Sequence, residues 1–165
     1  MYAGTLNFGN NGFTGTVPKE LYALTNLTTL DLSNTKLYEE ISTAIGAMSQ
    51  LVYFRAANTG IRGTLPTQLF SLAELRTLDL SSGKLTGSLS ESFSKLTNLD
   101  VAILHNNGFT GTIPAGFGRL PFLGKCGDNW KSVKVGCSIF SHKYISFYYF
   151  RKIGTAFERP YWLCI

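Results

Sequence analysis

The sequence predicts an α/β repeat solenoid, a coiled chain in which every turn contributes one strand and one short helical return. Three observations predict this fold. Leucines recur at positions 27, 51, 75, 99 and 123, each 24 residues after the last. Every 24-residue unit begins with apolar and polar residues in alternation, and its second half carries apolar residues three positions apart.

The 24-residue register also holds at other apolar positions. Six further columns keep the same step along the chain, and they start at Leu6, Phe8, Phe13, Val17, Leu21 and Leu24. A single insertion would shift every later column, so the spacing indicates stacked coils rather than a helical domain with coincidental leucines. One coil cannot bury its apolar face alone, and at least about three coils must stack to form a core.

The strand comes first in each unit. In residues 75–80, Leu78 and Leu80 alternate with Thr77 and Asp79, which is the period of a strand. Stacked coils place these strands side by side in a parallel sheet, about 4.8 Å apart. The leucines then face the core, and the polar positions between them face the open surface of the sheet.

Glycine and asparagine residues follow the strand and turn the chain. The return segment then carries an apolar triplet with a spacing of three residues, such as Leu69, Leu72 and Leu75. This spacing suits a short 3₁₀ or helical segment on the side of the coil opposite the sheet.

Residues 75–89 and, more completely, residues 107–114 resemble the plant-type leucine-rich repeat, whose pattern is LxxLxLxxNxLxGxIPxxLxxLxx. The diagnostic G-x-[IVL]-P element stands at 15–18, 63–66 and 111–114. The resemblance extends from residue 2 to about residue 123. It implies a right-handed leucine-rich repeat coil with a parallel concave β-sheet and a convex side of short 3₁₀, helical or irregular segments.

The same resemblance implies where such a protein works. The class includes receptor-like protein ectodomains, polygalacturonase inhibitors and related protist proteins, so it implies an extracellular or cell-surface recognition role. The partner would be a protein, peptide or saccharide ligand on the concave face. The alternatives are a structural spacer in a larger receptor and a secreted inhibitor of a polysaccharide-degrading enzyme. Partial threonine rows also suggest an ice- or sugar-facing ridge, but Tyr38, Glu40 and Arg62 interrupt these rows.

In the family, an asparagine in the turn satisfies backbone groups of adjoining coils with its side chain. In this chain the residue type at that position differs from coil to coil. These residues, the turn-asparagine column, are Asn11, Thr35, Thr59, Gly83 and Asn107. Threonine replaces part of this hydrogen bonding and glycine none, and an unpaired buried backbone group costs about 1–3 kcal/mol. We therefore expect the middle coils to be looser than the outer coils or to use ordered water.

The second coil departs further from the pattern. It carries Glu39, Glu40 and Ser42 in the segment where the family has its glycine and proline. We expect the second-strand segment of this coil to be irregular.

Stacking aligns a column of polar residues at the centre of the open face. Asp31, Arg55 and Asp79 are neighbours in this column, which places the arginine between two carboxylates, close enough for charge-assisted pairing. With Tyr53 and His105 they form the candidate ligand-binding set. One interpretation is a recognition patch for a partner with donors and acceptors. The other is that Arg55 only neutralises the two aspartates.

The sequence predicts no metal centre, no cofactor site and no enzyme. His105 shares its face with no second His, Cys or carboxylate at ligand spacing. The motifs G-x-S-x-G, H-E-x-x-H, Walker A and the dinucleotide fingerprint are all absent from the sequence. A non-catalytic binding module is therefore the expected function.

The net charge of +5 comes from the last 42 residues. Residues 1–123 carry eight basic and eight acidic residues, and residues 124–165 carry seven basic and two acidic ones. The repeat array is therefore neutral, which argues against a nucleic-acid-binding body.

The 24-residue register stops after residue 123, and residues 1–123 are predicted to form an array of about five units, the first incomplete. Residues 124–137 resemble the start of a disulfide-bearing C-terminal cap, which implies a Cys126–Cys137 bridge; two free buried thiols are the alternative. Residues 138–165 form an aromatic-basic tail, expected to be poorly ordered; the alternatives are binding to an anionic membrane surface or non-specific binding to nucleic acid. Its apolar stretch of about 12 residues is too short to span a bilayer. Cys164 is left unpaired.

The beginning of the chain shows no signal peptide, because Met1 is followed at once by half a coil. We therefore expect a fragment of a longer chain or an incomplete gene product. Leu6 and Phe8 lie at an uncovered end of the array, so self-association through this end is expected at high concentration. Asn26 begins the tripeptide Asn-Leu-Thr, which matches a glycosylation sequon.

Overall fold

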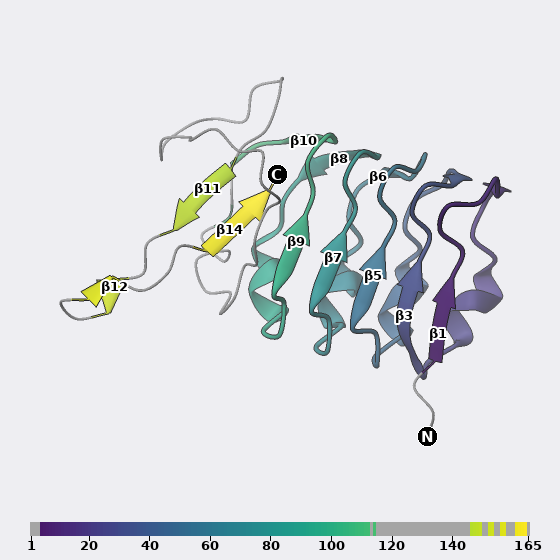
Figure 1. Cartoon of the computed structure of the whole chain (residues 1–165), viewed down its shortest axis with the longest axis horizontal. Helices are drawn as coiled ribbons and strands as arrows, with labels where there is room; N and C mark the ends of the chain where they lie inside the picture. Colours follow the sequence, from purple (N-terminus) through teal and green to yellow (C-terminus); the bar gives the residue numbers. More distant parts are fainter. Residues whose placement is uncertain are drawn as a thin grey trace.

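The computed structural model describes residues 4–112, 114, 146–149, 152–153, 156–157 and 161–164. Five parallel strands, one from each coil, stand side by side in one sheet and form the row of arrows in Figure 1. In order they are β1 (Gly4–Asn7), β3 (Leu27–Asp31), β5 (Tyr53–Arg55), β7 (Thr77–Asp79) and β9 (Val101–Ile103). The register pairs residues 24 positions apart, such as Leu30 with Phe54 and Phe54 with Leu78. The predicted solenoid with a parallel sheet is therefore confirmed.

The helical returns are short 3₁₀ helices on the opposite side of the coil, behind the strands in Figure 1. The described residues include η1 (Lys19–Ala23), η2 (Thr43–Ala47), η3 (Thr67–Ser71) and η4 (Glu91–Lys95). Ser42 caps η2 by accepting a hydrogen bond of 3.2 Å from the backbone N of Ala44. Ser90 caps η4 in the same way, and prolines, whose φ is restricted by the ring, precede η1 and η3.

A second set of short strands follows the main strands along the chain, and in the first four coils each precedes the 3₁₀ helix. These strands are β2 (Thr14–Gly15), β4 (Lys36–Leu37), β6 (Arg62–Gly63), β8 (Lys84–Ser88) and β10 (Gly108–Thr110). They form two separate ladders, β2 with β4, and β6 with β8 and β10. One isolated bridge between Glu40 and Arg62 stands between the ladders.

The break in these ladders falls at Glu39. Glycines occupy the same column in the other four coils, at positions 15, 63, 87 and 111, and all four have φ between +78° and +96°. Side chains other than glycine rarely adopt this backbone conformation, so Glu39 follows a different path. The expected irregular segment in the second coil is confirmed.

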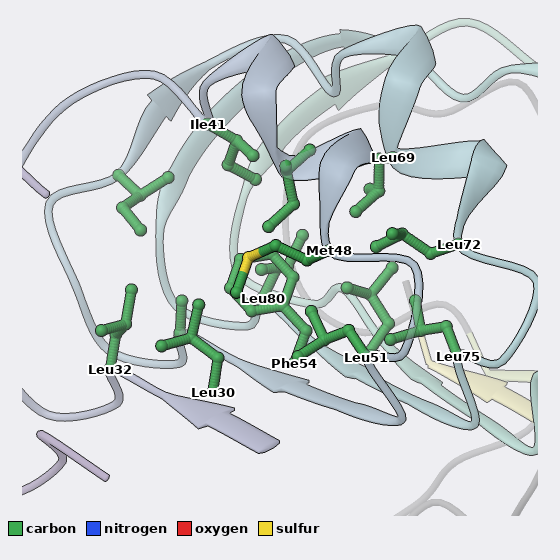
Figure 2. Packing of buried hydrophobic residues seen from close by; sticks show 14 of the residues in the cluster. Leu30, Leu32, Ile41, Met48, Leu51, Phe54, Leu69, Leu72, Leu75 and Leu80 are labelled. Atoms are coloured by element: carbon green, nitrogen blue, oxygen red, sulfur yellow. The ribbon is translucent and has the colours of Figure 1, made fainter. Parts of the chain in front are cut away.

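The core lies between the sheet and the 3₁₀ helices. Figure 2 shows Met48, Leu51 and Phe54 close together, with Leu72 and Leu75, which lie 24 residues after Met48 and Leu51, beside them. The columns predicted from the 24-residue spacing supply these side chains, and Met48, Leu51, Leu72 and Leu75 are completely buried. Stacking of coils, rather than folding of any single coil, removes this apolar surface from water.

Left-handed residues form a further column that the sequence analysis did not identify. Asn10, Asn34, Asn58, Ser82 and Asn106 have φ between +53° and +58°. Asparagine tolerates this conformation better than most residues. Asn34 Nδ2 donates to Asn10 Oδ1 at 2.9 Å, and Asn58 Nδ2 donates to Asn34 Oδ1 at 3.0 Å, so the turns are joined by an exposed side-chain ladder.

The threonines in the turn-asparagine column act within their own coils. Thr35 Oγ1 donates to the carbonyl of Leu32 at 2.8 Å, and Thr59 Oγ1 donates to that of Ala56 at 2.9 Å. Each threonine therefore replaces part of the asparagine hydrogen bonding, as predicted.

Gly83 in the same column is compensated by Asn107 from the next coil. Asn107 Nδ2 donates to the Leu80 carbonyl at 2.8 Å, and Asn107 Oδ1 accepts from the Leu85 N–H at 3.0 Å. A Cβ at Gly83 would lie 2.9 Å from Asn107 Oδ1. The space left by Gly83 therefore admits the neighbouring asparagine, which joins the two coils. That the middle coils are looser remains a prediction.

Four strands are described near the C-terminus: β11 (Ser146–Tyr149), β12 (Lys152–Ile153), β13 (Ala156–Phe157) and β14 (Tyr161–Cys164). β14 pairs in parallel with β9 through Cys164 and Ile103, and in antiparallel with β11. The division into array, cap and tail remains a prediction. The proposed Cys126–Cys137 disulfide lies outside the described residues. No helix in the described part of the chain has the length and apolar character needed to cross a membrane.

Candidate ligand-binding site

The candidate site lies on the open face of the sheet, on the five parallel strands that the coils contribute. The strand register places Asp31 opposite Arg55 and Arg55 opposite Asp79, on β3, β5 and β7. The same register places Tyr53 between Thr29 and Thr77. The predicted alignment of the central column is therefore observed, because a constant 24-residue spacing leaves no freedom to shift one strand against the next.

Arg55 contacts one of the two flanking aspartates. Its Nη1 lies 4.0 Å from Asp31 Oδ2, and the side chains of the arginine and the aspartate are 45% and 17% exposed. The guanidinium carbon lies 5.6 Å from the centre of the Tyr53 ring, within reach of a cation–π interaction. Arg55 is thus held loosely between a carboxylate and an aromatic face, and its donors remain open to solvent.

The expected pairing of Arg55 with Asp79 is wrong. Among the described residues, Asp79 makes no ion pair with Arg55. Its Oδ1 instead accepts hydrogen bonds from the hydroxyl of Ser81 at 2.7 Å and from the backbone N of Ser81 at 3.1 Å. These bonds hold the Asp79 carboxylate at the end of its own strand.

Asp31 is oriented by the same kind of local turn. Its Oδ1 accepts from the backbone N of Ser33 at 2.9 Å, and Asn7 accepts from the N of Gly9 at 2.8 Å in the first coil. Ser33 and Ser81 therefore fix the carboxylates of the site. Both lie in the repeated sequence Asp-Leu-Ser, a local signal that could have identified them.

His105 lies apart from the other candidate residues. It follows β9, two strands from Arg55, which corresponds to about 10 Å across a parallel sheet. Its carbonyl accepts a hydrogen bond of 2.9 Å from the N of Ser82. The structure therefore brings Asp31, Tyr53 and Arg55 together and leaves His105 at the other end of the face.

The sequon asparagine, Asn26, is exposed at the turn before β3. The hydroxyl of Thr28, two residues later, donates to the carbonyl of Gly4 at 3.0 Å. Modification at Asn26 remains a prediction. Within the described residues, no group of three or more His, Cys, Asp and Glu side chains is placed to hold a metal ion.

The family model described as Leucine Rich Repeat matches residues 26–48, 74–96 and 97–120. A search of curated proteins gave no match. Several solved structures are similar. The Arabidopsis receptor kinase HAESA, in complex with the peptide hormone IDA and the co-receptor SERK1, has a TM-score of 0.70 and 32% identity over 72% of this chain. The match covers 20% of that chain.

The leucine-rich repeat ectodomain of the receptor kinase SOBIR1 from Arabidopsis thaliana has a TM-score of 0.67 and 33% identity. That match covers 72% of this chain and 65% of SOBIR1. A plant ice-binding protein has a TM-score of 0.68 and 28% identity, over 70% of this chain and 38% of that one. The chain spans less than two thirds of each of these three proteins. The matched segments are leucine-rich repeats, and the fold is similar to that of plant leucine-rich repeat ectodomains.

Proposed function

We propose that the chain is a non-catalytic module that binds a protein or peptide ligand through its concave sheet, as part of an extracellular recognition protein or receptor ectodomain. The observation that carries this proposal is the pair formed by Arg55 and Asp31 beside Tyr53, on the open face of a sheet whose backbone is fixed on both sides. Two similar structures support this proposal. HAESA is a receptor kinase in complex with a peptide hormone, and the SOBIR1 structure is the ectodomain of a receptor kinase.

The geometry suits a ligand that carries both donors and acceptors. The Arg55 guanidinium offers donors toward solvent, and Asp31 is oriented by the Ser33 N–H. Because the strands and turns hold these groups before binding, little conformational entropy is lost when a ligand binds. A sheet of this kind binds by shape and charge without a large rearrangement.

Two observations argue against other functions. The Ser81 hydroxyl donates to the Asp79 carboxylate at 2.7 Å, so its hydrogen bond is not that of a serine nucleophile to a histidine base. Tyr38, Glu40 and Arg62 are exposed and interrupt the threonine rows, which disfavours the flat regular surface that an ice-binding function needs. The fold alone does not decide between these functions, since similar structures include an ice-binding protein.

Peptide selection tests the proposal. A random phage-displayed peptide library is selected on the immobilised 165-residue chain, and the affinities of selected peptides are measured by calorimetry for the wild type, Arg55→Ala and Arg76→Ala. Arg55→Ala should weaken binding about tenfold or more, the value expected for a lost charge-assisted hydrogen bond. Arg76 is a matched control because it is also exposed and ion-paired, to Asp100 at 3.3 Å, yet lies outside the central column.

The melting temperature distinguishes the two interpretations of Arg55. A recognition role predicts lost binding with a nearly unchanged melting temperature, since exposed ion pairs contribute about 0–1 kcal/mol. Equal losses of binding and stability would assign Arg55 to the sheet alone. Peptides that bind all three proteins equally would leave the structural spacer as the better proposal, and binding of plant cell-wall oligosaccharides in place of peptides would point to a saccharide ligand.

A further inference from the structure

The central column of the concave face carries two carboxylates and one guanidinium. Strands β3, β5, β7 and β9, neighbours in the row of arrows in Figure 1, place four residues opposite one another in this column: Asp31, Arg55, Asp79 and Ile103. Arg55 pairs with Asp31 at 4.0 Å and, among the described residues, makes no ion pair with Asp79. The column therefore keeps one carboxylate that no cation of the described chain pairs with.

The Asp79 carboxylate is held in one orientation. Its Oδ1 accepts hydrogen bonds from the hydroxyl of Ser81 at 2.7 Å and from the backbone N of Ser81 at 3.1 Å, and Ser81 is buried. Its other oxygen, Oδ2, accepts no hydrogen bond within the part of the chain that the structure describes, and it is open to solvent. A fixed carboxylate oxygen that faces solvent is an acceptor for a charged donor on a ligand.

Asp31 is a poorer receptor for a ligand cation. Its carboxylate is already paired with Arg55, and its side chain is only 17% exposed. A ligand cation at Asp31 would also lie beside the Arg55 guanidinium, which carries the same charge. Of the two aspartates, Asp79 is therefore the one that offers a free oxygen.

The strand next to Asp79 adds apolar side chains to the same face. The register places Val101 opposite Thr77, and Ile103 opposite Asp79. Val101 and Ile103 are half-buried, whereas Ala102 between them is buried in the core. Because neighbouring strands are about 4.8 Å apart, the open face changes from charged to apolar within one strand spacing.

We infer that the concave face selects peptides that carry a basic residue two positions from an apolar residue, with the basic side chain on Asp79 and the apolar one on Ile103. Two residues of an extended peptide span about 6.7 Å, and a long basic side chain takes up the difference from the strand spacing. The lysine or arginine donates a charge-assisted hydrogen bond to Asp79 Oδ2, and the apolar side chain removes Ile103 from water. This inference rests on the proposed function, because it names the ligand chemistry that the same face selects.

Peptide selection on matched variants tests the inference. A random phage-displayed peptide library is selected on the 165-residue wild type, on Asp79→Asn and on Asp100→Asn. Asparagine keeps an oxygen that accepts from Ser81, so Asp79→Asn should fold like the wild type. Asp100 is the matched control, because it is also a partly exposed carboxylate but is ion-paired, to Arg76 at 3.3 Å, outside the central column. The wild type and Asp100→Asn should enrich the basic residue, and Asp79→Asn should not.

A variant of the apolar neighbour tests the second half of the pattern. Ile103→Thr keeps a β-branched side chain, which suits a strand, and replaces a methyl-bearing carbon with a hydroxyl. Selection on Ile103→Thr should retain the basic residue and lose the preference for an apolar residue two positions away. An unchanged apolar preference would overturn the placement on Ile103.

Calorimetry with one peptide selected on the wild type measures the contact with Asp79. Replacing the basic residue of the peptide with glutamine should weaken binding to the wild type and to Asp100→Asn about tenfold, and binding to Asp79→Asn much less. An equal loss with all three proteins, or no loss with the wild type, overturns the inference and leaves Arg55-dependent binding, and so the proposed function, in place. A wild type that selects no peptide overturns both. Since the substitution is in the peptide, the wild-type result does not depend on the stability of any variant.

Discussion

The charge of Glu39 acts on the buried phenol of Tyr22 in a chain whose core is made mainly of aliphatic and phenylalanine side chains. Tyr22 is buried in η1, and Glu39 Oε1 accepts a hydrogen bond from the backbone N of Val17 at 2.6 Å. Burial raises the pKa of the Tyr22 phenol, the charge of Glu39 raises it further, and a backbone hydrogen bond with Ser42 acts in the opposite direction. Glu39, which stands where the other coils have glycine, therefore also raises the pKa of Tyr22 in the preceding coil.

This raised pKa predicts a loss of stability at alkaline pH. The folded chain holds the phenolic proton more firmly than the unfolded chain, so the contribution is complete below the ordinary tyrosine pKa of 10.0 and is lost as pH rises through the folded pKa. The free energy of unfolding should therefore fall more steeply above about pH 10 in the wild type than in Tyr22→Phe. Urea titrations between about pH 8 and pH 11 measure both slopes. Tyr38→Phe, at an exposed tyrosine, serves as the control, and identical slopes for all three proteins would contradict the prediction.

At the scale of the element, the same residue type at the same position of the repeat is buried to a different extent in different coils. Leu24 and Leu72 occupy the same column, each as the residue that follows a 3₁₀ helix. Leu72 is completely buried, whereas Leu24 is 47% exposed because, among the described residues, η1 packs against η2 on one side only. The local sequence pattern is the same at both positions, so the difference comes from stacking alone.

Paired alanine substitutions measure this difference. Leu72→Ala should lower the free energy of unfolding by about 2–5 kcal/mol, the range for a leucine removed from a packed core. Leu24→Ala should lower it by less than about 1 kcal/mol, because much of the side chain is already in water. Chemical denaturation of dilute protein gives both values. Similar losses would mean that the outer coil is covered in solution.

Much of each element could be predicted from its own residues. The alternation of Leu78 and Leu80 with polar residues identified the strands, and the spacing of Leu69 and Leu72 identified the returns. The left-handed column that includes Asn34 was missed, because a single asparagine in a polar turn does not distinguish this backbone conformation from others. The compensation of Gly83 by Asn107 was missed because it joins residues from two coils.

At the scale of the whole molecule, the array and the C-terminal segment meet in the described residues where β9 lies beside β14, with Ile103 paired to Cys164. The sequence predicts that residues 138–165 contribute little to the stability of the array. Deleting them should therefore shift the melting temperature by less than about 4 °C, which corresponds to about 1 kcal/mol for a domain of this size. Differential scanning calorimetry of the truncated and full chains measures the shift. A larger decrease would show that β14 is part of the folded array.

The candidate site shows the same division between prediction and structure. The column of Asp31, Arg55 and Asp79 followed from the repeat, because an unbroken 24-residue step sets the strand register. The direction of each carboxylate did not follow from it. Arg55 pairs with Asp31, whereas Asp79 Oδ1 accepts hydrogen bonds of 2.7 and 3.1 Å from Ser81.

The sequence alone determined the solenoid, its coil length, its buried columns and the neighbours on its concave face, because these all follow from one constant spacing of apolar residues. Only the tertiary structure decided which of those neighbours interact and how Asn107 compensates for Gly83. The repeat spacing sets which residues lie side by side, whereas the direction of each side chain depends on contacts within and between coils.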